Sequence, residues 1–175
     1  MAKKQSNKAI GNRYERMIAK ELSLWMFNDE HILKRDTTSG AVKTIWTGDI
    51  IPHGQLPIIW NRQWIFHIET KYGYEQFKPN FWNYTKVYEW AVKSKLESLQ
   101  YNQFIMYLIC NFTGMKPLLF TNKLLDPLYF NICFPIFDDN DNLLDYIYSY
   151  NYKEILKYKF EALYNIEDLI GKTQC

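Results

Sequence analysis

Residues 64–71, WIFHIETK, are the stretch of sequence that decides the predicted fold. Aromatic and aliphatic side chains alternate with polar ones along it, and a period of two is typical of a β-strand with one buried face. The same period places His67, Glu69 and Lys71 together on the other face, with Thr70 pointing away. A carboxylate and an ammonium group therefore project side by side from one strand.

Periodicity in the flanking sequence predicts helices and strands that alternate along the rest of the chain. The expected helices are residues 12–26, 81–99 and 152–164. The expected strands are residues 31–35, a strand that starts around Asp49, residues 104–111, residues 117–121 and a pair that flanks the turn at 138–142. Since neither an internal repeat nor a linker interrupts this order, the simplest account is one α/β domain.

Length and composition predict a folded globular protein. The 175 residues, 47% hydrophobic and 18% aromatic, are enough to bury a core, and this composition argues against disorder. No apolar run reaches the ~20 residues of a membrane helix, and the basic N-terminus lacks the apolar segment of a secretory signal. Three cysteines without CxxC spacing are expected to be reduced thiols in the cytoplasm, or in the host cytoplasm if the protein is viral.

Charge is distributed unevenly along the chain. Residues 1–95 contain 15 Lys and Arg against 9 Asp and Glu, a net charge of +6, whereas residues 96–175 carry −4. A basic half favours a polyanionic partner such as nucleic acid, because neutralisation of phosphates dominates such binding. Ordinary scatter of surface charge is an equally good explanation of the numbers alone.

Asp49 adds a second carboxylate to the pair on residues 64–71. If the strand that starts around Asp49 pairs with residues 64–71 as an antiparallel neighbour, Asp49 lies across from Glu69. Two carboxylates this close repel each other unless a cation lies between them, and oxygen ligands suit Mg²⁺ or Mn²⁺. Lys71 could then position or help deprotonate a water and stabilise charge on a phosphate, which is what metal-assisted hydrolysis of a phosphodiester needs. Taken alone, a Glu-x-Lys pair more often marks a solvated strand face.

Four short motifs give this constellation an ordered context. They are GNRYER (11–16), TSGA (38–41), GDI (48–50) and IETK (68–71), expected on a helix, a loop, a strand and a strand. Their order and spacing resemble the archaeal and phage Holliday-junction resolvases and related phage endonucleases of the PD-(D/E)XK superfamily. The resemblance covers roughly residues 9–72, and beyond it only the order of a helix and two strands matches.

The resemblance implies a fold and a division of the chain. The fold is an α/β, restriction-endonuclease-like core with a mixed central sheet flanked by helices. A single nuclease domain would then span residues 1–175. Its expected parts are a loose basic arm at 1–10, a nuclease core at 11–121 and an extension at 122–175 packed on that core.

The resemblance also assigns roles to individual residues. Glu15, Asp49 and Glu69 would bind the metal, and the carbonyl of Thr70 would be a further ligand. Lys71 would be the catalytic base or the group that orients the water. The alternative for Glu15 is a solvated helix glutamate paired with a neighbouring cation.

Other residues near these motifs are weaker candidates. Ser39 occupies the place of a serine that assists catalysis in resolvases, although a Ser-Gly pair is more often only a turn. The candidate phosphate contacts are Arg13, Arg16, Arg35 and Lys43. The three histidines show no metal-binding spacing. His67 shares the face of Glu69 and could contact the site, but the favoured expectation is a half-buried histidine with its hydrogen bonds satisfied.

The function expected from these observations is a Mg²⁺-dependent endonuclease, with Mn²⁺ able to substitute. The finer expectation is a Holliday-junction resolvase that acts on four-way or other branched DNA as a homodimer, away from membranes. The alternatives are a restriction- or repair-type nuclease on linear duplexes or flaps, and a catalytically silent DNA-binding module of the same fold. A purely structural interaction protein would explain the aromatic residues but not the ordered motifs.

Overall fold

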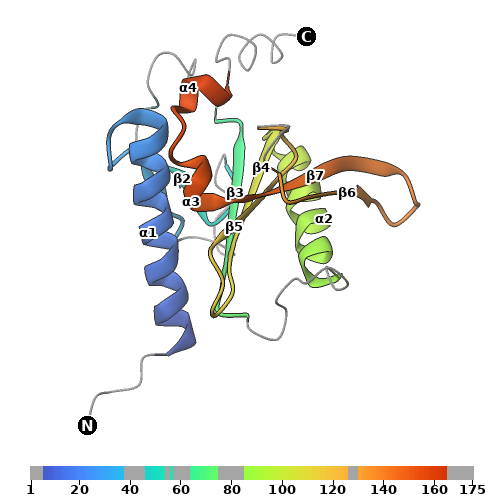
Figure 1. Ribbon diagram of the computed structural model, residues 1–175, viewed down its shortest axis with the longest axis horizontal. Coiled ribbons are helices and arrows are strands. Elements are labelled where there is room, and N and C mark those ends of the chain that lie inside the picture. Colours follow the sequence, from blue (N-terminus) through green and yellow to red (C-terminus); the bar gives the residue numbers. More distant parts are fainter. Residues whose placement is uncertain are drawn as a thin grey trace.

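The computed structural model describes residues 6–37, 46–53, 56, 64–74, 85–125 and 130–164. They form an α/β fold in which a mixed sheet of five strands is packed against helices (Figure 1). The helices are α1 (Asn7–Phe27), α2 (Thr85–Gln100), α3 (Tyr152–Ile155) and α4 (Phe160–Leu163). The strands are β1 (Leu33–Arg35), β2 (Ile50–Pro52), β3 (Phe66–Tyr72), β4 (Ile105–Asn111), β5 (Leu118–Thr121), β6 (Ile132–Phe137) and β7 (Leu143–Asn151). The predicted α/β class, with a mixed sheet flanked by helices, is confirmed.

The five-stranded sheet has the order β3-β4-β5-β7-β6. β3 and β4 are parallel, with Glu69 opposite Leu108 and Lys71 opposite Cys110. The remaining neighbours are antiparallel. The short strands β1 and β2 pair with each other in a separate antiparallel ribbon. β3, which carries the Glu-x-Lys pair, is thus an edge strand of the five-stranded sheet.

Helices cover both faces of this sheet (Figure 1), and the apolar side chains of β4 pack into the cores on both faces. Tyr107 and Ile109 belong to the core on the α1 side, whereas Met106 and Leu108 belong to the core on the α2 side. All six residues from 105 to 110 are buried. A strand covered on both faces reads as a continuous apolar run, which is why residues 104–111 lack alternation.

α1 begins at Asn7, five residues before the predicted helix start, so residues 7–10 form its first turn rather than part of a basic arm. The reason is a cap: the Ser6 hydroxyl accepts a hydrogen bond from the backbone N–H of Ala9 at 3.3 Å. Asn28, in the left-handed conformation, ends the helix. The buried stripe of Tyr14, Ile18 and Leu22 faces the sheet.

The chain after residue 122 contributes to the sheet itself, because β7 lies between β5 and β6. The predicted helix over 152–164 is two short helices, α3 and α4, separated by turns at residues 156–158. These turns let Phe160 and Tyr164 stack at 4.8 Å and pack beside Phe66 in the α1-side core. None of the described helices is long and apolar enough to cross a membrane.

Candidate active site

Gly48 and Asp49 run alongside β3 and fix the position of the Asp49 carboxylate. Gly48 forms an isolated bridge with Ile68, and the Asp49 N–H donates to the Ile68 carbonyl at 2.8 Å. Gly48 has φ +116°, and a Cβ there would lie 2.8 Å from the Ile68 carbonyl oxygen. Only glycine permits this backbone conformation at so close an approach.

The bridge between Gly48 and Ile68 is parallel, so the expected antiparallel pairing of the two strands is wrong. Asp49 Oδ2 accepts hydrogen bonds from the Thr70 N–H at 2.8 Å and from the Thr70 hydroxyl at 3.2 Å. A side-chain carboxylate therefore takes the place that a backbone carbonyl would hold in a regular ladder. Asp49 is held beside Thr70, next to Glu69 in sequence, rather than directly across from Glu69.

Glu69 and Lys71 project from the same face of β3, as the alternation predicts. Lys71 Nζ donates to Glu69 Oε2 at 2.9 Å, and the two side chains are 22% and 17% exposed. Burial lowers the pKa of Lys71, but the carboxylates of Glu69 and Asp49 outweigh this and raise the pKa above its usual value. Lys71 is therefore an ammonium group at neutral pH when no metal is bound.

The Asp49 carboxylate is electrostatically unfavourable in the folded chain. Burial, followed by the negative charge of Glu69, raises the pKa of Asp49 from 3.8 to about 6, and Lys71 and the two hydrogen bonds from Thr70 only partly oppose this. A divalent cation would relieve this repulsion, and Asp49 and Glu69 offer the oxygen donors that Mg²⁺ prefers. On this observation the two carboxylates fit a magnesium ion.

A cleft of about 640 Å³ opens beside Asp49 and Lys71, and Glu69 is not among the residues that line it. The N-terminal half of α1 lines one wall with Lys8 and Glu15, and the end of β3 lines the other with Thr70 and Lys71. Asp49 also contributes to the lining. Because α1 carries the GNRYER motif and β3 carries the IETK motif, a ligand bound in the cleft would contact both motifs.

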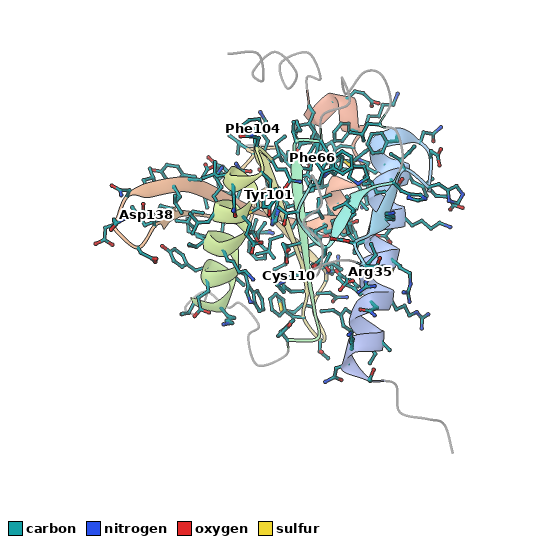
Figure 2. All side chains as sticks on the ribbon, turned by 180° about the vertical axis from the view of Figure 1, so that it is seen from behind. Arg35, Phe66, Tyr101, Phe104, Cys110 and Asp138 are labelled. Carbon is teal, nitrogen blue, oxygen red and sulfur yellow. The ribbon has the colours of Figure 1, made fainter. Side chains whose placement is uncertain are left out.

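Glu15 lies in this cleft but is paired with Arg35, whose Nε donates to Glu15 Oε2. Figure 2 shows Arg35 between α1 and the sheet. Both side chains are only 19% exposed, which differs from a solvated helix glutamate. Among the described residues, the ligand atoms of Glu15, Asp49 and Glu69 do not come close enough to one another to form a three-residue metal site.

The other predicted residues are more dispersed. Arg13 and Arg16 are exposed on α1. Ser39 and Lys43 lie outside the described residues. The structure thus brings Asp49, Glu69, Thr70 and Lys71 together, with Glu15, which is paired with Arg35, on the α1 wall of the cleft.

Sequence reasoning missed one cluster on the α2 side of β3. His67, Glu69 and Glu97 place ligand atoms within 4.8 Å of one another, as a set of three among the described residues. His67 is fully buried, and neither ring nitrogen has a hydrogen-bond partner, so the expectation of a half-buried, satisfied histidine is wrong. The His67–Glu69 spacing was the available signal, but Glu97 enters only through the packing of α2.

Comparisons with family models, with curated proteins and with solved structures find no match for this chain.

Proposed function

We propose that this protein is a Mg²⁺-dependent endonuclease that hydrolyses phosphodiester bonds in DNA. The observation that carries the proposal is the grouping of the Asp49 and Glu69 carboxylates with the Lys71 ammonium at one edge of the sheet. Two carboxylates and a lysine are the parts needed for metal-assisted phosphodiester hydrolysis, and Asp49 and Lys71 line an accessible cleft.

The order of the elements supports a PD-(D/E)XK-like core. The helix with Glu15 comes first, two short strands follow, and β3 carries the Glu-x-Lys pair before α2 and β4. This is the order of a helix, strands, a helix and further strands that the sequence resemblance implies. We infer that the conserved architecture of that superfamily underlies the described fold.

In the proposed mechanism the carboxylates of Asp49 and Glu69 would hold the ion, which would activate a water and withdraw charge from the phosphate. Thr70 keeps Asp49 in place through its N–H and hydroxyl, so the carboxylate is oriented before metal binds. Its carbonyl is the further ligand that the resemblance implies.

Lys71 has two proposed roles, catalytic base or orienting cation, and its electrostatics favour the second. In the metal-free protein the raised pKa keeps the side chain protonated at neutral pH, so it enters the reaction as a hydrogen-bond donor rather than a proton acceptor. An ammonium at this position would orient the attacking water and stabilise the negative charge that develops on the phosphate.

DNA would approach along the N-terminal half of α1. Lys8 lines the cleft, and Arg13 and Arg16 are exposed on the same helix. Contacts from these cations to phosphates would position the duplex without reading its sequence. The finer proposal is a homodimer that acts on four-way or other branched DNA, since resolution of a junction requires two active sites at fixed separation.

The test is cleavage of a labelled panel of four-way junctions, flaps, duplexes and single strands. We expect nicking with Mg²⁺ or Mn²⁺ and none with excess chelator. Asp49→Asn and Glu69→Gln should abolish nicking while leaving DNA binding intact. Glu89→Gln, an exposed residue of α2, is the matched control and should cleave normally. Undiminished cleavage in chelator, or by a folded Asp49→Asn or Glu69→Gln variant, would refute the proposal.

A further inference from the structure

The cluster on the α2 side of β3 has a different composition from the proposed magnesium site. His67 lies at the centre, with its Nε2 3.9 Å from Glu69 Oε1 and 3.8 Å from Glu97 Oε2. Both distances exceed those of a hydrogen bond. The two carboxylates therefore surround the ring nitrogen without bonding to it.

These separations match the spacing of ligands around a small cation. An ion that binds nitrogen and oxygen at about 2.0–2.2 Å holds its ligand atoms roughly 3–4 Å apart. All three candidate ligand atoms in this cluster lie within 4.8 Å of one another. Small side-chain adjustments would bring them to bonding distance of a common ion.

His67 gives independent support, because a buried polar group normally has a partner. Its side chain is 0% exposed, and both Nδ1 and Nε2 are without hydrogen bonds. The Gln103 side chain is an electrostatic neighbour of the imidazole, but its hydrogen bonds go to the Thr47 backbone and to the Phe66 carbonyl. The imidazole nitrogen is thus left directed at two carboxylates, an arrangement that a bound cation would satisfy.

We propose that His67, Glu69 and Glu97 form a second metal site, which binds a divalent first-row transition ion such as Zn²⁺ or Mn²⁺. One imidazole nitrogen with two carboxylate oxygens suits these ions better than Mg²⁺ or Ca²⁺, which prefer oxygen alone. The site lies beyond the proposed nuclease reaction, because two of its three ligands, His67 and Glu97, belong to no part of that mechanism.

Glu69 links the two sites through its separate oxygens. Oε2 accepts from Lys71 on the cleft side, and Oε1 is the oxygen nearest His67. Glu97 supplies the route from solvent, since its side chain is 34% exposed, and its other oxygen lies 3.7 Å from Lys93 Nζ. An ion would enter past Glu97 and come to rest against the buried imidazole.

Direct metal binding tests the proposal without DNA. Chelator-stripped protein would be titrated with Co²⁺, a spectroscopic substitute for Zn²⁺, and the visible absorption of the bound ion recorded, with Zn²⁺ as competitor. We expect Glu97→Gln and His67→Gln each to weaken binding by roughly tenfold or more. Zn²⁺ should also raise the melting temperature of the wild-type chain, and much less that of Glu97→Gln.

Two controls locate the ion. Glu89→Gln removes a more exposed carboxylate from the same helix and should bind Co²⁺ like the wild type. Asp49→Asn should retain the part of the Co²⁺ absorption that Glu97→Gln loses, because Asp49 is not a ligand in this cluster. Loss of binding in Asp49→Asn with retention in Glu97→Gln would place the ion at the other site and overturn the proposal, as would absence of Co²⁺ binding. If His67→Gln does not fold, the Glu97→Gln comparison alone decides.

Discussion

Replacing Asp49 with asparagine should stabilise the metal-free protein at neutral pH. The carboxylate is half-buried beside Glu69, and its pKa rises from 3.8 to about 6 on folding. At 1.36 kcal/mol for each tenfold change in proton affinity, that rise corresponds to about 3 kcal/mol of destabilisation once Asp49 is ionised. Asparagine keeps an oxygen that accepts from the Thr70 N–H and hydroxyl but carries no charge. We expect a gain in unfolding free energy of about 1–3 kcal/mol.

The gain should depend on pH. Between pH 3.8 and about 6 the folded chain binds more protons at Asp49 than the unfolded chain does. The unfolding free energy of the wild type therefore falls as pH rises through this range. The stabilisation by Asp49→Asn should be largest above about pH 7 and small near pH 4, where the wild-type residue is protonated in the folded state and only partly ionised in the unfolded state.

Urea denaturation in chelator at about pH 7.5 and about pH 4 measures the effect. Asp138→Asn is the control with the opposite sign, because hydrogen bonds from Asn142 hold the pKa of Asp138 below its usual value. That variant should lose stability at neutral pH. Mg²⁺ should stabilise the wild type more than Asp49→Asn. If Asp49→Asn is destabilised equally at both pH values, Asp49 is a structural hydrogen-bond acceptor, and the electrostatic reasoning for the metal site fails.

Three further results are expected. Lys71→Met should lower the cleavage rate by about 100-fold or more, measured in single turnover, while metal binding persists; a rate near wild type would exclude Lys71 from the reaction. Gly48→Ala should lower the melting temperature and cost about 1–3 kcal/mol, because of its positive φ and the close Ile68 carbonyl; unchanged stability would mean that this backbone relaxes easily. Light scattering should show a dimer, and competition between junction and duplex DNA should show a preference for junctions, with an affinity for DNA that falls steeply with salt. A monomer that prefers duplex DNA would favour the restriction- or repair-type alternative.

The sequence predicts those elements whose periodicity is strong. The strand expected at 64–71 is β3, Phe66–Tyr72, and the apolar runs at 104–111 and 117–121 are β4 and β5. The helix expected at 81–99 is described as α2 from Thr85 to Gln100. Alternation alone also placed Glu69 and Lys71 on a common face, because that relation depends only on the pleat of one strand.

Relations between distant segments could not be predicted in the same way. The parallel approach of Gly48 to Ile68 depends on a glycine with positive φ and on a side chain that replaces a backbone acceptor. Glu97 reaches His67 only because α2 packs against β3, and no local spacing encodes that contact. The insertion of β7 beside β5 is likewise a long-range pairing.

The position of β7 has a consequence for the order in which the protein can be built during synthesis. β5 ends at Thr121, yet its second neighbour begins only at Leu143, after β6 has been made. Until then a nascent chain contains the proposed catalytic strand β3 and its partner β4, but the edge of β5 that pairs with β7 in the folded protein is unpaired. Phe120 on β5 then lacks its neighbour on β7. Such an edge is prone to pair with other chains. Ribosome-bound chains stalled soon after residue 121 should therefore recruit chaperones strongly, and release from them should coincide with emergence of residues 143–151.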